Sequence, residues 1–592
     1  QWAEALGGLI ADIQSARAYG FATEELAIAK RAALAAAEHA AQTEATQDAQ
    51  ALLGAMNRAR SAGELPRAAA QNMVLLQQLL PTVTRADVTT VLAHNFAPEQ
   101  RAYIVSLPEK PGLDIPSREA VRAVVTAALA TPVTAWQSQE RPTTLLAHDP
   151  TPGSIATRTH FAPLAITQVT LGNNVRVHYR FMDFKKDDAT VTLTLAGGTI
   201  REPAEQQGIT EVATLALTTP ATSTLSSTDI RDIMTGKKVR LEARTTEDAV
   251  VLQVSGAPEA LADGLRLAYV LLQDAKIEPA SVALWKEQKL QELAASRSRI
   301  DFRARETLHA LTSGDDPRRR TLTPEQVQAR ASDIAGAQAW LDALLRTAPL
   351  EVAIVGDIPE PQALDIATTF LGTLPARPRE DPTLVPLRQV AGFTGPQERR
   401  ADVETITPRA HPILFWRSAD WQDVQGRRLM FVASRILERR VRQEVREERG
   451  LTYSTATYAR PDKAYPATSA LYVEFTADPD KVNEAVALAK AVVERFAAEG
   501  PTDEEMDTVR KQLQNQLETL YKEPRFWVDV LSDLEYHGST LADLDGLVEK
   551  FLALSKADIA AEVRKTIVPE RFAMVIARRK APGATDERRS TN

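Results

Sequence analysis

Gly500-Pro501-Thr502-Asp503-Glu504-Glu505-Met506 opens a stretch with helical spacing, and Gly20-Phe21-Ala22-Thr23-Glu24-Glu25-Leu26 opens another one 480 residues earlier. Each stretch has a Thr or Asp at the cap position, followed by acidic residues in the first turn. Acidic side chains at that place interact favourably with the helix N-terminus. The two stretches therefore predict two equivalent helices, over 503–518 and 23–38.

The correspondence continues further along the chain. Ala86-Asp87-Val88 precedes Pro98-Glu99 by the same spacing that separates Ala557-Asp558-Ile559 from Pro569-Glu570. Each Pro-Glu leads into a predicted short strand, at 102–105 and 573–576. A weaker third copy has a helix over 279–295 and a strand over 351–355. Three copies in the same order predict homologous units of about 200 residues.

The fold class follows from the order of elements within these units. Strands at 190–195 and 413–416 each precede helices and a hairpin region, without strict alternation of strand and helix. This order favours an α+β fold, in which an antiparallel-rich sheet packs against helices. Pro-rich stretches separate the units, and the chain opens with Gln1 inside a helical pattern, as expected of a fragment or a processed product. The predicted parts are 1–107, 108–160 as a linker, 161–378, 379–580, and a flexible tail at 581–592.

Composition excludes several classes of function. The net charge is −8 and acids and bases are interspersed, so no basic field is available to bind nucleic acid. The chain has no Cys, which excludes disulfides and thiolate ligands. No run of 18 apolar residues appears, so we expect no membrane span.

The spacing of the His residues shows whether this chain has the usual ligand pattern of a metal site. The eight His residues are far apart, and no two of them fall within five positions, so no helix turn presents a pair of imidazoles. Neither H-E-x-x-H nor H-x-x-E-H occurs. We therefore expect no metal site and no catalytic residue in this chain.

The segment richest in potential chemistry is Val445-Arg-Glu-Glu-Arg-Gly-Leu-Thr-Tyr-Ser454. Gly450 is predicted to end a helix, with Arg446 in its last turn and Tyr453 at the start of the next strand. Folded around this turn, a guanidinium and a phenol can donate several hydrogen bonds to peptide carbonyls or a carboxylate. The alternative is structural: Arg446 pairs with Glu447 or favours the helix C-terminus.

This segment resembles the Arg/Tyr motif of the pitrilysin/insulinase family, the inverted-zincin metallopeptidases. In that family an Arg, and a Tyr seven residues later in the fourth domain, bind the substrate backbone close to a zinc ion held by the first domain. Arg446 and Tyr453 have this spacing. Lys522-Glu-Pro-Arg-Phe-Trp527 also resembles the fourth domain, and Val355-Gly-Asp357 the close of the third, so that the resemblance covers about 1–580.

The resemblance implies that the parts of this chain correspond to particular domains of the family, and that together they form half of a clamshell. Residues 1–107 correspond to the end of the second domain, 161–378 to a third domain and 379–580 to the fourth. The zinc-motif positions of the third domain fall on Glu211, Thr214 and Leu215, with Glu292 in the place of the last ligand. The His, Glu and His are all replaced, so this copy is degenerate. Glu292 is then expected to be a solvated helix residue.

The implied function is that of a substrate-binding, chamber-closing half of a zinc-dependent endopeptidase that acts on peptides or unfolded polypeptides. Zinc would come from a missing N-terminal half or a partner subunit, and this chain alone is predicted to be inactive. The alternative is a non-catalytic structural or binding member of the same family. Bacterial relatives suggest the periplasm.

Overall fold

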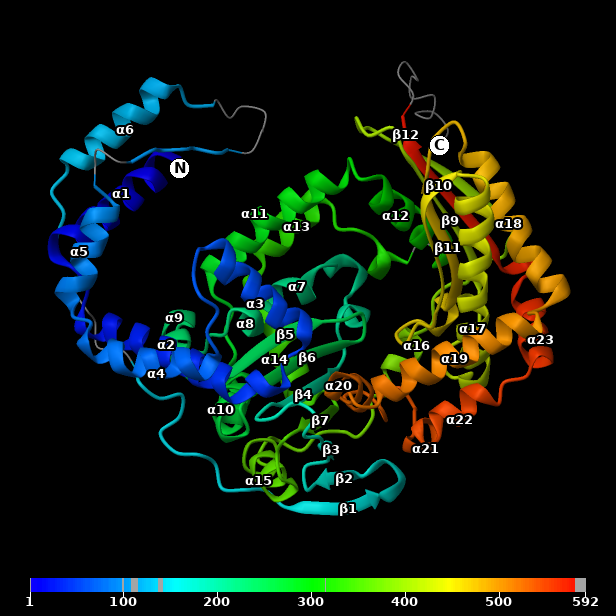
Figure 1. Ribbon diagram of the computed structural model, residues 1–592, viewed down its shortest axis with the longest axis horizontal. Coiled ribbons are helices and arrows are strands. Elements are labelled where there is room, and N and C mark those ends of the chain that lie inside the picture. The colour runs from blue at the N-terminus through cyan, green and yellow to red at the C-terminus, as the bar shows by residue number, and fades with distance from the viewer. Residues whose placement is uncertain (1, 98–100, 108–114, 137–141, 315, 581–592) are drawn as a thin grey trace. The chain divides into compact units, whose positions relative to one another are not determined.

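The computed structural model describes residues 2–97, 101–107, 115–136, 142–314 and 316–580 (Figure 1). It contains two compact units. One comprises Gln1–Leu145, Lys185–Asp187 and Thr228–Val239, and the other comprises Leu146–Phe184, Asp188–Ser227 and Arg240–Asn592. None of the described helices is both long and apolar enough to cross a membrane.

The first unit is built from helices. Ile10 is the single buried residue in the six helices that lie within residues 2–130. These helices are α1 (Trp2–Tyr19), α2 (Thr23–Thr43), α3 (Ala49–Ser61), α4 (Ala69–Leu79), α5 (Arg85–Asn95) and α6 (Arg118–Ala130). The helix predicted over 23–38 is thus present. The stretch predicted as a linker, 108–160, holds α6 and most of the first strand of the second unit.

The strand predicted at 102–105 is wrong, because residues 101–107 adopt neither helix nor strand. A strand needs a neighbour for its N–H and C=O groups, and no strand occurs among the described residues before Ile155. Pro98 and Glu99, which the repeat also used, lie outside the described residues, as does the predicted tail 581–592.

The second unit contains a seven-stranded sheet in the order β1-β2-β3-β7-β4-β6-β5. Its strands are β1 (Ile155–Phe161), β2 (Ile166–Leu171), β3 (Arg176–Phe181), β4 (Ala189–Ala196), β5 (Val239–Thr245), β6 (Ala249–Gly256) and β7 (Leu350–Gly356). The pairing of β3 with β7 is parallel, whereas β7 with β4 and β4 with β6 are antiparallel. The predicted strands at 190–195 and 351–355 are both part of this sheet.

Helices follow and connect these strands. They are α7 (Ile209–Ala213), α8 (Leu215–Thr218), α9 (Ser227–Met234), α10 (Leu261–Asp274), α11 (Pro279–Ser296), α12 (Ile300–Thr312), α13 (Pro324–Ser332), α14 (Ile334–Thr347), α15 (Glu360–Phe370) and α16 (Leu384–Leu387). The helix α11 begins at its Pro and so agrees with the predicted helix over 279–295, since Pro suits the first turn of a helix.

A five-stranded sheet follows, in the order β10-β11-β9-β12-β8. Its strands are β8 (Gln397–Val403), β9 (Ala410–Arg417), β10 (Thr452–Arg460), β11 (Ala470–Ala477) and β12 (Phe572–Arg579). This order matches β5-β6-β4-β7-β3 of the larger sheet. The directions match as well: β9 is antiparallel to β11 and β12, and β12 is parallel to β8. The predicted α+β class, with antiparallel-rich sheets against helices, is confirmed.

One face of the smaller sheet is covered by long helices (Figure 1). The helices of this part of the chain are α17 (Val424–Val441), α18 (Val482–Glu499), α19 (Asp503–Leu520), α20 (Pro524–Leu531), α21 (Leu541–Leu544), α22 (Leu547–Leu552) and α23 (Lys556–Thr566). The predicted cap at the start of α19 is present, and the structure shows that it forms a capping box: Glu505 N donates to Thr502 Oγ1 at 3.2 Å, and Thr502 N donates to Glu505 Oε2 at 2.8 Å.

The two sheets exchange helices. α12 lies between β6 and β7 in the sequence, yet it packs on β8, β9 and β12 of the smaller sheet through Ile300, Ala304 and Leu308. In the reverse direction α20, which belongs to the later part of the chain, packs on β4 and β7 of the larger sheet. There Trp527 and Leu531 are fully buried. Each sheet is therefore covered on one face by a helix from the other half of the unit.

A buried carboxylate fixes the segment after α20 to the larger sheet. Glu351, on β7, is 1% exposed and accepts the backbone N–H groups of Glu535 and Tyr536, both at 2.8 Å. His178 Nε2 lies 2.7 Å from the same carboxylate. Burial alone would raise the pKa of Glu351, but the hydrogen bond with His178 and the nearby charge of Arg176 hold that pKa below its ordinary value.

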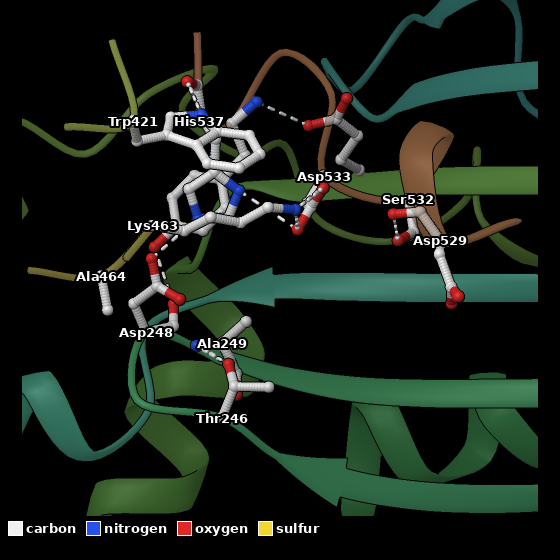
Figure 2. A network of polar contacts seen from close by, with 12 residues as sticks. Thr246, Asp248, Ala249, Trp421, Lys463, Ala464, Asp529, Ser532, Asp533 and His537 are labelled. Carbon is white, nitrogen blue, oxygen red and sulfur yellow. Dashed lines mark hydrogen bonds and ion pairs between the residues drawn. The ribbon is translucent and has the colours of Figure 1, made fainter. Parts of the chain in front are cut away.

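A second junction is built around His537 (Figure 2). Its Nε2 lies 2.8 Å from Asp248 of the larger sheet, and its Nδ1 lies 3.1 Å from Asp533. Arg388 pairs with Asp248 and Lys463 pairs with Asp533, each at 2.6 Å. Burial works to lower the pKa of His537, but the two carboxylates outweigh it and raise that pKa above 6.5. The pKa values of Asp248 and Asp533 are lowered although burial opposes this, chiefly because the imidazole of His537 lies beside each carboxylate.

The exchanged helix generates a prediction for stability. Leu531→Ala should lower the free energy of unfolding by about 2–5 kcal/mol, since it removes a fully buried side chain and leaves a cavity. Leu284→Ala is the matched control, because Leu284 is 58% exposed and should change the free energy by less than about 0.5 kcal/mol. Urea denaturation followed by circular dichroism measures both. Equal effects of the two substitutions would contradict the packing role of α20.

The His537 junction generates a prediction for pH dependence. A raised pKa in the folded state stabilises the protein below the unfolded value of 6.5, and this contribution is lost as pH rises through the folded value. The loss of stability in His537→Gln should therefore be largest at about pH 5.5 and smaller at about pH 9. Thermal unfolding across this range measures it, with the exposed His94→Gln as control. A deficit that grows with pH would show that the imidazole is not held in its charged form.

Candidate functional site

Arg446 lies in an unusual continuation of α17. The α-helix ends at Val441, and Arg442–Glu448 continue it as a π-helix. The buried side chains of Val441 and Val445 anchor this segment in the core, while Arg446 is exposed. π-Helical turns insert an extra residue into a helix and occur often at functional sites. The sequence predicted a helix through this region but not the change of its hydrogen-bonding pattern.

Gly450 ends the helix, as predicted. Its φ is +59°, in the left-handed region that glycine adopts without steric cost. Gly450 N donates to Arg446 O at 3.1 Å, and Leu451 N donates to Val445 O at 3.0 Å. Leu451 is 6% exposed, so the chain returns to the core immediately after the turn. This turn fixes the backbone on both sides of Arg446.

Tyr453 lies at a bulge in the edge strand β10. The pairing with β11 shifts between Thr452 and Ser454, and Tyr453 occupies the extra position. Thr452 is buried, and its hydroxyl donates to Thr476 O at 2.6 Å. Tyr453 is 81% exposed, even though tyrosine usually buries most of its ring. Bulges commonly redirect a side chain near functional sites.

Among the described residues, the guanidinium of Arg446 and the hydroxyl of Tyr453 form no hydrogen bond or ion pair with another side chain or with the backbone. One form of the structural alternative, a pair between Arg446 and Glu447, is not formed, because Glu447 lies 3.6 Å from Arg442 instead. The other form stands, since Arg446 lies in the last turn of the helix, where a positive charge suits the C-terminus. The donors of Arg446 and Tyr453 are therefore available to a ligand at the same helix-to-strand turn.

An ammonium group lies between the two acidic residues that the resemblance assigns to a degenerate zinc motif. Glu211 is on α7, where it accepts from Trp285 Nε1 at 3.1 Å and lies 3.1 Å from Lys289 Nζ. The same Lys289 Nζ lies 3.4 Å from Glu292. Burial opposes the charge of Lys289, but the two carboxylates outweigh it and raise its pKa. A positive side chain thus stands between the two acids that remain at this position.

The other two motif positions have structural roles. Thr214 donates its hydroxyl to Thr210 O at 2.8 Å, and Leu215 begins α8. The side chain of Glu292 is 64% exposed, as the prediction of a solvated helix residue requires, although it also pairs with Lys289. No group of three His, Asp or Glu side chains suited to a metal ion occurs in the described part of the chain. The residues at this position do not fit zinc.

Lys289 was missed by the sequence reasoning. Its spacing of three residues from Glu292 was a usable signal for a pair on one helix face. Its contact with Glu211, on a different helix 78 residues earlier, had no local signal.

Comparison with known proteins gives three kinds of match. Residues 337–513 match the family model described as the peptidase M16 inactive domain. The probable zinc protease PqqL of Escherichia coli K12 is 21% identical over 364 residues, which cover 60% of this chain and 37% of the relative. The zinc protease PQQL-like of Arabidopsis thaliana is 22% identical over 411 residues, which cover 67% and 40%. The chain therefore spans about two fifths of the length of these relatives.

Solved structures share the fold. The periplasmic protease PqqL from Escherichia coli has a TM-score of 0.66 at 16% identity, over 97% of this chain and 63% of that chain. A peptidase M16 inactive domain from Pseudomonas fluorescens has a TM-score of 0.58 at 16% identity, over 70% and 98%. These matches confirm the resemblance to pitrilysin/insulinase-type metallopeptidases that the sequence predicted.

Proposed function

We propose that this chain is the substrate-binding, chamber-closing part of a zinc-dependent endopeptidase that acts on peptides or unfolded polypeptides. The observation that carries the proposal is the exposed, unpartnered pair Arg446 and Tyr453. The backbone around both is fixed by the Gly450 turn and the bulge in β10, while their donors face solvent. Donors held in place before substrate arrives stabilise a developing oxyanion without a cost of reorganisation.

The zinc ion would be held by a part of the enzyme other than these residues, in an N-terminal half or a partner subunit. Two relatives are named zinc proteases, and each is longer than the part that this chain matches. When bound, zinc polarises the scissile carbonyl and lowers the pKa of a water molecule. This chain positions the peptide. Arg446 and Tyr453 donate hydrogen bonds to the backbone carbonyls of the peptide and fix the register of the peptide.

The domain assignment is part of the same proposal. Residues 161–378 and 379–580 are a third and a fourth domain with one ancestral fold. The shared order β5-β6-β4-β7-β3 and β10-β11-β9-β12-β8 supports this assignment. Residues 1–107 form the end of a second domain, and 108–160 connect it to the third. We extend the periplasmic location of the Escherichia coli relative to this protein as well.

The pair can be tested in the complete enzyme, in which this chain works with its zinc-bearing part. Arg446→Ala and Tyr453→Phe should each lower kcat/KM for peptide cleavage by roughly 10- to 1000-fold, because each removes hydrogen bonds made in the transition state. Arg449→Ala is the matched control, since it removes an equally exposed positive charge three residues away. Thermal unfolding should be unchanged in all three variants.

A wild-type rate in Tyr453→Phe and Arg446→Ala would contradict the proposal and favour a non-catalytic structural member of the family. Unfolding of Arg446→Ala would instead indicate a structural role for the guanidinium.

The isolated chain generates a separate prediction. It should bind no stoichiometric zinc and cleave no peptide, because Lys289 places an ammonium between Glu211 and Glu292. Metal analysis after dialysis against zinc, together with a fluorogenic peptide assay with and without a chelator, measures this. Chelator-sensitive cleavage by the isolated chain would show that a metal centre lies within it.

A further inference from the structure

A cavity of about 440 Å³ lies among the first turns of α17, the segment after β10, α20 and the short helices α21 and α22. Its lining includes neither Arg446 nor Tyr453, so it is separate from the site described above. Cavities of this size take small organic molecules. Its chemistry is divided between an apolar wall and a group of charged side chains.

The apolar wall is formed by α17, α21 and α22. Phe431 and Phe551 meet edge to face with ring centroids 5.6 Å apart, and Leu544 and Leu547 line the cavity beside them. These side chains are only partly covered by the protein itself. An apolar body placed against them would remove their remaining surface from water, and each Å² of apolar surface so covered contributes about 25 cal/mol.

Most of the charged groups in the cavity are already paired. Lys463 Nζ lies 2.6 Å from Asp533 (Figure 2). Arg428 donates to the backbone carbonyl of Asp543 at 2.7 Å. The carboxylate of Asp543 in turn caps α21 by accepting from Thr540 N at 2.9 Å. Each of these side chains therefore already has a hydrogen-bond or ion-pair partner in the described part of the chain.

Arg427 is the exception. Its guanidinium carbon lies 4.0 Å from the ring centroid of Trp421, and Trp421 is itself held by a hydrogen bond from its Nε1 to His537 O at 3.0 Å. The buried Nε of Arg427 has no hydrogen-bond partner, and its side chain forms no hydrogen bond or ion pair with any described residue. Burial and the nearby charge of Arg428 lower the pKa of Arg427, against the opposing effect of the carboxylates around it. The neighbouring carboxylate of Asp423 is engaged by Gly426 N at 2.8 Å.

We propose that this cavity binds a small amphipathic carboxylate, with the carboxylate on Arg427 and an apolar body against Phe431, Leu547 and Phe551. A guanidinium donates two parallel hydrogen bonds to a carboxylate, and the stacked Trp421 holds its plane in place. This chemistry occurs in free apolar carboxylic acids and at the C-terminus of an apolar peptide. The cavity is thus a second binding site, distinct from the one that holds substrate.

The test measures binding to the full chain by isothermal titration calorimetry. Decanoate and the dipeptide N-acetyl-leucyl-phenylalanine represent the two sources of the carboxylate. Methyl decanoate and the dipeptide amide have the same apolar bodies without the charge. At least one acid should bind, and it should bind roughly 10- to 100-fold more tightly than its neutral counterpart, because a charged hydrogen bond is lost with the carboxylate.

Arg427→Gln should weaken binding of the acid by the same factor and leave the neutral compound unchanged. Arg439→Gln is the matched control, because Arg439 is an exposed residue of α17 that does not line the cavity. The comparison of acid with neutral compound in the wild-type chain remains decisive if Arg427→Gln proves unstable.

The two acids distinguish the two sources of the carboxylate. Binding of decanoate alone assigns the site to free carboxylic acids, and binding of the dipeptide acid alone assigns it to peptide C-termini. Equal affinity for acid and neutral compound, full affinity in a folded Arg427→Gln variant, or no binding of either acid by the wild-type chain would each overturn the proposal.

Discussion

The second unit of this protein depends on the exchange of helices between its two sheets. α12 and α20 occupy equivalent places in the two sheet orders, and each covers a face of the sheet to which it does not belong. A sheet face left open to water would expose a continuous apolar surface. Glu351 completes the arrangement, because its buried carboxylate is satisfied only when the backbone of Glu535 and Tyr536 is in place. Neither half can therefore satisfy its buried surface and polar groups alone.

The candidate site depends on this framework through the smaller sheet. α17 packs on one face of that sheet, and its π-helical end carries Arg446 beyond the last buried turn. β10 is an edge strand, so a bulge there costs few ladder hydrogen bonds and allows Tyr453 to leave the sheet surface. The rigid core thus presents two donors whose own partners are absent from the described chain. In the part of the chain that follows β4, by contrast, Lys289 pairs with Glu211 and Glu292, so these charged groups have partners within the chain.

The junction around His537 lies next to the cavity that contains Arg427. Asp533 belongs to both, since it pairs with His537 and Lys463 and also lines the cavity. Trp421 likewise contacts both, because its indole donates to His537 O and its ring stacks on Arg427. A ligand bound on Arg427 would therefore rest on side chains that also hold the two sheets together. The cavity and the junction thus share part of their structure.

The sequence by itself determined the local elements and the pair at the turn. Helix caps, acidic first turns and repeated spacings are short-range patterns. They predicted the helices at 23–38, 279–295 and 503–518 and the strands at 190–195 and 573–576. They also placed Arg446 and Tyr453 on the two sides of the turn at Gly450. The strand at 102–105 failed because a strand exists only beside another strand. Tertiary structure alone decided that Lys289 contacts Glu211 and that Glu351 accepts from the backbone of Glu535 and Tyr536. It also decided that the side chain of Arg427 has no hydrogen-bond or ion-pair partner among the described residues. These contacts, or their absence, involve residues far apart in the sequence, and no local spacing encodes which distant groups will meet in a folded core.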